Sequence, residues 1–364
     1  MRRCVRCILP ETMPFIKFNA EGICNYCLNY KKIKVKGEEA LEELAAKYRS
    51  RNGKPDCVLS FSGGRDSSFG LHYLKKVLRM NPIAFTYDWG MVADIGRRNQ
   101  ARMVGKLGVE HVIMAANIPK KRKFIRENIE AWLERPHLGM VPLFMAGDKM
   151  VEYYVGKAAK NYGIKLIFLC RGNELETSEY KFGFLGVRDS EPRGIMHEMP
   201  VIERVKLALS SIWQYILNPA YLNSSAWDTL FAYRVTCMMR FNFVYLWHYV
   251  RWEEEKIVST LKREYDWETE KDTILTWRTD DGTSPFYNYI YVTIAGFTEN
   301  DAFRSNQIRE GILTRSEALR IIEQENQPRY EAIKDYLKKV GLDYDEVIRR
   351  IDAIPKAYNK LDFK

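Results

Sequence analysis

The stretch that decides the fold is Asp56-Cys-Val-Leu-Ser-Phe-Ser-Gly-Gly-Arg-Asp-Ser-Ser68. Its first six residues, Asp56 to Phe61, form a short apolar run typical of a buried strand, and residues 69–78 have the apolar spacing of a helix. Gly63 and Gly64 lie between them and permit a tight turn. A strand, a glycine-rich turn and a helix in this order direct backbone N–H groups and a helix N-terminus at an anion. The stretch therefore predicts a phosphate-binding loop in an α/β fold.

The side chains of this loop can add to the backbone donors. Ser62, Ser67 and Ser68 carry hydroxyls that can hydrogen-bond an anion, and Asp66 can cap the helix or help to hold Mg²⁺. The loop is not a Walker motif, because the required lysine and glycine spacing are absent. A plain glycine-rich turn is the alternative, and the complete S-G-G-x-D-S-S string counts against it.

Strand and helix patterns alternate downstream of the loop. We expect strands at 82–87, 109–114 and 164–169, and helices at 38–51, 95–107 (with Asp94 as N-cap), 120–133 and 143–162. This alternation predicts right-handed parallel crossovers, with the ligand beyond the carboxyl ends of the strands. Farther on, helices are expected at 253–265 and 329–340, and Thr314 to Glu317 has the spacing of a capping box. We divide the chain into a cysteine knuckle (1–36), a nucleotide-binding domain (37–200) and a mainly helical substrate or partner region (201–364).

The composition excludes several classes of protein. The 364 residues are 46% apolar and 29% charged, which rules out disordered, fibrous and collagen-like chains. The formal charge of +10 favours an anionic partner without choosing one. Neither a secretory signal nor an uninterrupted apolar run of about 18 residues is evident, so we expect a cytoplasmic protein without stable membrane insertion. Residues 226–250 are expected to form a buried helix, the alternative being a face that lies on a membrane surface.

Four of the seven cysteines form two C-x-x-C pairs, Cys4 with Cys7 and Cys24 with Cys27. Two such turns can complete a tetrahedron of sulfurs around one ion. Four thiolates favour structural Zn²⁺, with an iron–sulfur cluster as the main competitor. The odd cysteine count does not suggest a secreted disulfide framework, and the three remaining cysteines are expected to be core residues.

The S-G-G-x-D-S-S string resembles the signature of the PP-loop ATP pyrophosphatases, which cleave ATP between the α and β phosphates. The resemblance implies a doubly wound parallel sheet of the adenine nucleotide alpha hydrolase kind, with ATP and Mg²⁺ as cofactors. It implies catalytic roles for Ser62, Asp66 and Ser67, and nucleotide contacts from Gly63, Gly64 and Ser68 as well. It further places adenine near Phe85, Thr86 and Asp88, and a second nucleotide loop at Gly172, Asn173 and Glu174. A turn glycine or a surface acid is the alternative at each of these later positions.

A second resemblance spans nearly the whole chain. It is carried by Cys4-x-x-Cys7-Ile-Leu-Pro-Glu-Thr-Met-Pro14, Gly22-Ile-Cys-Asn-Tyr-Cys27, Leu59-Ser-Phe-Ser-Gly-Gly-Arg-Asp-Ser67 and Phe303-Arg-Ser-Asn-Gln-Ile-Arg-Glu-Gly311. These motifs are similar to those of the N-acetyl sugar amidotransferases of bacterial surface-polysaccharide (lipopolysaccharide O-antigen) biosynthesis. The resemblance implies conversion of an acetamido group on a nucleotide-linked sugar, a UDP-sugar by expectation, into an acetamidino group. It also implies glutaminase and cyclase-like partner subunits that supply ammonia.

The last of these motifs is dense in polar groups. Asp301, Arg304, Asn306 and Arg309 recur at spacings that can place them on one helix face directed at the sugar nucleotide. The alternative is a solvated or salt-bridged helix face, and without the family likeness that alternative would be preferred.

The rival function is tRNA thiolation, since such enzymes also combine a PP-loop with N-terminal C-x-x-C units, and a charge of +10 would suit tRNA phosphates. Several of them carry a further C-x-x-C in the catalytic sheet. Here Cys57, Cys170 and Cys237 are unpaired in the sequence, so we expect no nucleic-acid partner.

Overall fold

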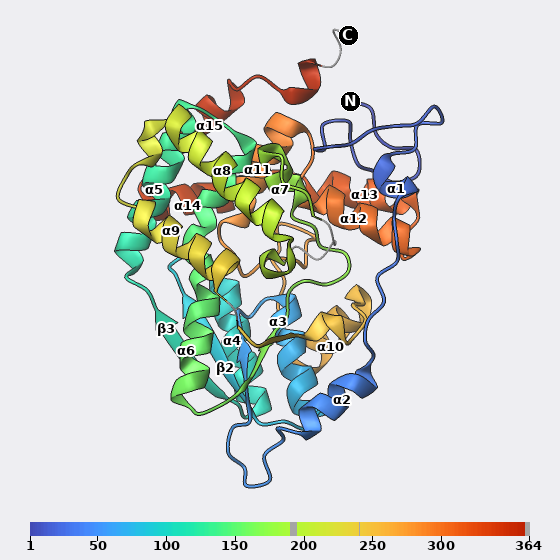
Figure 1. Cartoon of the computed structure of the whole chain (residues 1–364), viewed down its shortest axis with the longest axis vertical. Coiled ribbons are helices and arrows are strands. Elements are labelled where there is room, and N and C mark those ends of the chain that lie inside the picture. The colour runs from blue at the N-terminus through green and yellow to red at the C-terminus, as the bar shows by residue number, and fades with distance from the viewer. Residues whose placement is uncertain (190–194, 240, 361–364) are drawn as a thin grey trace.

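The computed structural model, which describes residues 1–189, 195–239 and 241–360, contains a five-stranded sheet (Figure 1). The strands lie in the order β3-β2-β1-β4-β5, and every neighbouring pair is parallel. Their bounds are β1 Cys57–Ser60, β2 Pro82–Asp88, β3 Glu110–Ala115, β4 Leu166–Leu169 and β5 Phe243–Tyr245. The predicted parallel sheet is confirmed, and β1, which precedes the glycine-rich loop, occupies its centre.

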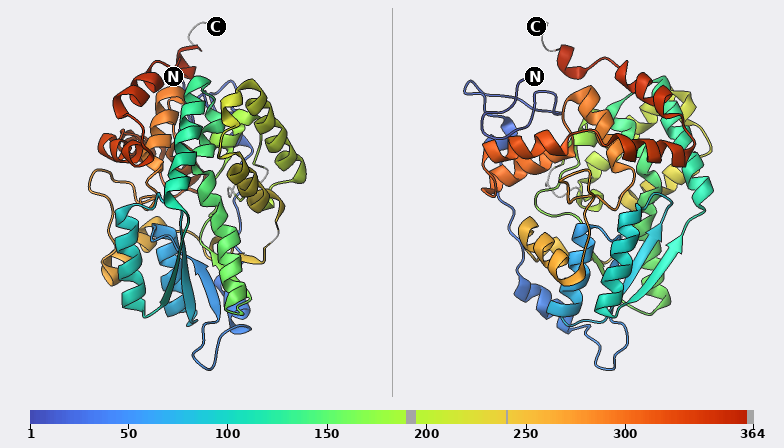
Figure 2. Two further views of the ribbon diagram at one scale, coloured as in Figure 1. Left: turned by 90° about the vertical axis from the view of Figure 1, so that its left-hand side faces the viewer. Right: turned by 180° about the vertical axis from the view of Figure 1, so that it is seen from behind.

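Successive side chains of the central strand enter two different cores, as the alternation of a strand requires. Val58 joins a cluster with Val155 and Ala159 of α6 (Val151–Asn161). Leu59 joins another with residues of α3 (Arg65–His72), α4 (Asp94–Leu107) and α10 (Glu254–Tyr265). Figure 2 (left) shows the sheet nearly edge-on between helices. The sheet is therefore doubly wound. Because both faces of such a sheet are buried, the sequences of its strands are continuous apolar runs.

The remaining helices of the sheet part are α2 (Glu38–Ala46), α5 (Ile118–Glu134) and a 3₁₀ segment, Leu138–Met150, that leads into α6. Two local expectations are wrong. The N-cap of α4 is Ala93 and Asp94 is its first residue, and the helix expected at 143–162 becomes α-helical only at Val151. Pro142 lies inside the 3₁₀ segment, one residue before the start of the expected helix.

The C-terminal region is mostly helical, as predicted. Its helices are α8 (Val201–Leu217), α9 (Ala226–Tyr233), α10, α11 (Ser284–Ala295), α12 (Glu299–Glu310), α13 (Arg315–Glu325), α14 (Tyr330–Val340) and α15 (Tyr344–Asp352), while the short α1 (Asn25–Leu28) and α7 (Glu179–Phe182) precede them. The predicted capping box of Thr314 and Glu317 begins α13. Figure 1 shows α12 and α13 beside α1 and the N-terminal segment.

The prediction of one helix over residues 226–250 is wrong. α9 ends at Tyr233, a π-helical turn follows at Arg234–Met238, and β5 then adds a strand to the edge of the sheet beside β4. Three residues are too few for a strand periodicity to be recognised in the sequence. None of the helices in the described residues is long and apolar enough to span a membrane.

Buried charges tie the loop after β1 to the helical region. Glu254 at the start of α10 accepts hydrogen bonds from Arg65, from Thr276 and, at 2.6 Å, from Arg304 of α12. Arg65 is almost fully buried, with its guanidinium 4.5 Å from the ring centre of Trp252. Although burial raises the pKa of Glu254, the charges of Arg65 and Arg304 lower it to about 2.

We expect Glu254→Gln to lower the free energy of unfolding by about 3 kcal/mol, because it leaves two buried guanidinium groups without their shared carboxylate. Glu255→Gln is the matched control, since Glu255 is exposed on the same helix. Because the folded pKa of Glu254 lies below its unfolded value, its contribution is complete near neutral pH and is lost as the pH falls from about 4.5 towards 2. Urea unfolding of the two variants at neutral pH is the measurement, and equal stabilities would contradict the assigned role.

Candidate nucleotide and metal sites

The loop between β1 and α3 has the geometry of an anion cradle. The hydroxyl oxygens of Ser62 and Ser67 lie 3.0 Å apart, and the Gly64 N–H donates to the Ser62 hydroxyl. Ser62 is exposed, whereas Ser68 is fully buried and its hydroxyl has no hydrogen-bond partner within the described part of the chain. The predicted residues Ser62 and Ser67 are thus brought together at the start of α3, while Ser68 lies beneath the loop surface.

The two glycines of the loop lie against different neighbours, a backbone carbonyl at Gly63 and a side chain at Gly64. A Cβ on Gly63 would lie 2.3 Å from the carbonyl oxygen of Gly96, and Gly63 has a φ of +81°. A Cβ on Gly64 would lie 2.4 Å from a carboxylate oxygen of Asp280. Any larger residue at Gly63 would force the loop away from α4, whereas a larger residue at Gly64 would have to displace the Asp280 carboxylate.

Residues from distant parts of the chain hold the loop in place. The indole N–H of Trp267 donates to the Gly63 carbonyl at 3.0 Å, and the Gln100 amide donates to the Ser62 carbonyl at 2.8 Å. The indole N–H of Trp252 donates to the carboxylate of Asp66 at 2.8 Å. These three residues position the loop rather than line it, and sequence reasoning missed them because no motif surrounds them.

The second predicted loop, after β4, is buried. Gly172 adopts a φ of +76°, and the Asn173 side chain accepts from the Leu175 N–H and donates to Glu176. One Glu174 oxygen accepts from the Trp252 N–H at 3.2 Å, and the other has no partner among the described residues.

Glu176, which the sequence analysis did not select, is the carboxylate that interacts with Asp66. Burial raises the pKa of Glu176 to about 7, with Arg278 opposing that shift and the charge of Asp66 adding to it. Glu174 instead interacts with Arg251 and Glu310, and burial raises its pKa as well. Of these two carboxylates, Glu176 is the one whose pKa is raised by the charge of Asp66.

The residues predicted to contact adenine are engaged within the sheet. The Phe85 carbonyl accepts from the Phe61 N–H at 2.8 Å, and the Thr86 hydroxyl donates to the Phe61 carbonyl at 2.6 Å. Asp88 pairs with Arg97 at 2.7 Å and accepts from the Gly90 N–H. They lie close to the cradle, and their contact with adenine stays a prediction.

The four polar residues of α12 have partners inside the protein. Asp301 pairs with Arg3, and Arg304 pairs with Glu254 and Glu325. Asn306 donates to the Leu175 carbonyl and accepts from Arg309. This is the arrangement of the alternative, an internally salt-bridged helix. A substrate role for these residues stays a prediction that their contacts do not support, although Asn306 and Arg309 line a pocket of about 730 Å³.

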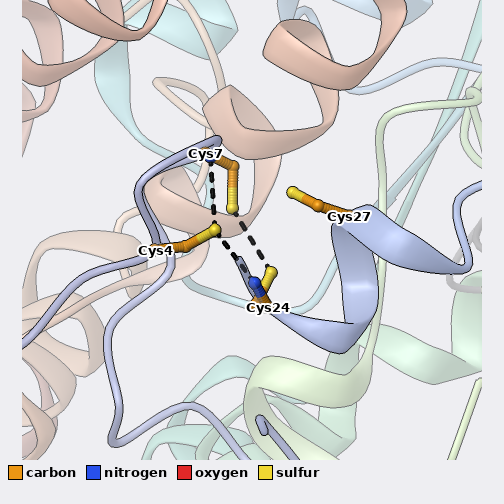
Figure 3. Close-up of side chains that lie close together, drawn as sticks. All are labelled: Cys4, Cys7, Cys24 and Cys27. Atoms are coloured by element: carbon orange, nitrogen blue, oxygen red, sulfur yellow. Dashed lines mark hydrogen bonds between the residues drawn. The ribbon is translucent and has the colours of Figure 1, made fainter. Parts of the chain in front are cut away.

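The four N-terminal cysteines form one buried group (Figure 3). Their sulfur atoms all lie within 4.8 Å of one another, and those of Cys7 and Cys24 are 3.7 Å apart. A tetrahedral ion with metal–sulfur bonds of about 2.3 Å places its ligands roughly 3.8 Å apart. The Cys24 N–H points at the Cys4 sulfur at 3.2 Å, a bond that favours a thiolate. The donor set therefore fits a metal ion, and the group could hold one.

Helix α12 contributes a positive charge to the cysteine group through Arg309. Its guanidinium lies 3.3 Å from the Cys7 sulfur and 3.4 Å from the Cys27 sulfur. A buried set of thiolates with a divalent ion carries net negative charge, which a neighbouring guanidinium offsets. Arg315 of α13 also donates to the carbonyls of Cys4 and Cys7.

Comparison with known proteins places few constraints on the chain. No family model matches it. Over 120 residues it is 33% identical to an uncharacterized protein of Methanocaldococcus jannaschii, and the match covers 31% of this chain and 42% of that protein. The chain thus spans less than half the length of this curated relative.

Two solved structures resemble the chain weakly. A U34-tRNA thiolase from Methanococcus maripaludis, solved with its [4Fe-4S] cluster, has 13% identity and a TM-score of 0.32, covering 90% of this chain and 91% of that one. An NH3-dependent NAD synthetase from Campylobacter jejuni has 14% identity and a TM-score of 0.28, covering 56% and 96%. Neither TM-score is high enough to carry an argument about this chain.

Removal of one thiolate should release the metal and destabilise the N-terminal segment. We expect Cys24→Ser to lose bound metal and to lower the unfolding midpoint by roughly 10 °C, whereas Cys237→Ser, at a buried cysteine outside the group, should keep the metal. Elemental analysis of the purified variants, with thermal unfolding before and after a chelator, measures both effects. Full metal content in Cys24→Ser would show that the ion lies elsewhere.

Proposed function

We propose that the chain is an AMP-forming, ATP-dependent amidotransferase that acts on a nucleotide-linked N-acetyl sugar. The observation that carries the ATP-dependent part is the cradle at the carboxyl end of β1, in the centre of a doubly wound parallel sheet. Ligands bind at this edge of such sheets, and the N-terminus of α3 and the paired serine hydroxyls suit a pyrophosphate group. The sugar and the amide chemistry rest on the sequence resemblance.

The reaction needs activation, because an amide oxygen is a poor leaving group. The acetamido oxygen attacks the α-phosphorus of ATP, the bond to pyrophosphate breaks, and an O-adenylyl imidate forms. Ammonia then adds to the imidate carbon and the carbon–oxygen bond breaks, which releases AMP, and loss of a proton leaves the amidine. The chain's task is to align oxygen with phosphorus and to stabilise the charge that moves onto pyrophosphate.

The residues of the site fit these tasks. The Ser62 and Ser67 hydroxyls and the loop N–H groups would bind the departing pyrophosphate. Asp66 and Glu176 would hold Mg²⁺, which supplies charge neutralisation when bound; Glu174 is the residue predicted from the sequence for this role. The cysteine group would hold Zn²⁺ as a structural ion, since all four ligand positions are filled by the chain.

Thiolation of tRNA is supported less well by the site. Cys57, Cys170 and Cys237 join no group of three or more metal-ligating side chains in the described part of the chain, and Cys57 and Cys237 are buried. Ammonia would come from glutaminase and cyclase-like partner subunits, and the enzyme would act in the cytoplasm without nucleic acid.

Pyrophosphate release tests the substrate class. With ATP, Mg²⁺ and ammonium, a UDP-linked N-acetyl sugar should stimulate release and tRNA should not. Ser62→Ala and Asp66→Asn should lower the rate at least about 100-fold, because each removes a group that acts on the departing phosphates. Ser259→Ala, at an exposed serine on α10, is the control and should keep the wild-type rate. Stimulation by tRNA alone would assign the protein to the rival class.

A further inference from the structure

A carboxylate of the chain lies in the phosphate cradle. The position that a Cβ on Gly64 would occupy is 2.4 and 2.8 Å from the two carboxylate oxygens of Asp280, so these oxygens lie against the bare backbone of the loop. The Ser62 hydroxyl also lies near enough to this carboxylate to lower its pKa, against the effect of burial. The same hydroxyl and the same glycine backbone are the groups expected to face a phosphate.

The segment that carries Asp280 is fastened to the loop after β2. The Ala93 N–H donates to the Asp280 carbonyl at 2.9 Å, and the Gly282 N–H donates to the Met91 carbonyl at 2.9 Å. Val92 and Asp281 form an isolated antiparallel bridge between these bonds. Residues 278–283 thus cross the cradle, although they lie more than 200 residues beyond it in the sequence. We call this segment the strap.

Few interactions hold the carboxylate itself in place. Burial raises the pKa of Asp280, and the nearby Ser62 hydroxyl is the main influence against that shift. The segment begins at Arg278, a non-glycine residue with a φ of +54°, a conformation that costs energy. A competing ligand would therefore have to displace only the Asp280 side chain, while the backbone bonds of the strap stay in place.

We propose that Asp280 is an internal counter-anion that occupies the cradle in the nucleotide-free protein, and that a pyrophosphate group binds by displacing it. This inference rests on the proposed function, because it requires that the cradle bind phosphate. A carboxylate and a phosphate cannot both lie against Gly64 and Ser62. Two negative groups placed side by side in the cradle would also repel each other. The apparent dissociation constant is then the intrinsic one divided by the fraction of molecules in which the carboxylate has left the cradle.

The test measures the binding of inorganic pyrophosphate by calorimetry, with and without Mg²⁺. Asp280→Ala and Asp280→Asn should each bind pyrophosphate at least tenfold more tightly than the wild type. Asp281→Asn is the matched control, because it removes the neighbouring charge but keeps an acceptor for the Thr283 N–H and hydroxyl, and its affinity should match the wild type. Trp267 fluorescence gives a second readout, since its indole bonds the Gly63 carbonyl. The asparagine variant keeps the size of the side chain and so decides the question if the alanine variant does not fold.

Unchanged or weaker pyrophosphate binding in Asp280→Asn would overturn the inference. Weaker binding that appears only with Mg²⁺ would also overturn it, and would make Asp280 a metal ligand instead. The two proposals fail separately. Tighter pyrophosphate binding without AMP formation from any acceptor would leave this inference standing and remove the proposed reaction. AMP formation with unchanged pyrophosphate affinity in the variants would support the proposed reaction and remove this inference.

Discussion

A chain of buried charges joins the centre of the sheet to the helical region. It runs from Arg65 of the cradle loop through Glu254 and Arg304 to Glu325, and every member needs the next because an unpaired buried charge is costly. Arg304 belongs to α12, ten of whose twelve residues are buried although most are polar. The same helix sends Arg309 to the cysteine sulfurs. One polar helix therefore sets the positions of both the cradle and the metal group relative to each other.

This constraint explains why the site is assembled from distant segments. The parallel sheet places the loop after β1 at the carboxyl ends of the strands. The segments around α10 and residues 276–283 then pack against this loop and bring Trp252, Trp267 and Asp280 next to it. The result is a loop whose carbonyls and acid are held by fixed donors, so little reorganisation is needed when charge moves onto a leaving group.

The parts that could be predicted from sequence are those with local signals. The strand, glycine turn and helix of residues 56–78 are contiguous, and the C-x-x-C pairs carry their chemistry in their spacing, so both were predicted correctly as structures. Asp280 and Trp267 could not be found this way, because their roles depend on tertiary contacts across some 200 residues. β5 is too short for a periodic pattern. On α12 the sequence leaves open whether the polar residues face a substrate or pair inside the protein, because a sequence does not show which charges find internal partners.

The products of ATP test the central claim most directly. Phosphorus NMR of a reaction that contains the protein, Mg²⁺, ammonium and a stimulating acceptor distinguishes the two possible cleavage sites. A cradle that holds the β and γ phosphates while the α-phosphorus is attacked must yield AMP and pyrophosphate in equal amounts. Formation of ADP and orthophosphate would contradict the account, because the bond would then have broken at the wrong phosphorus.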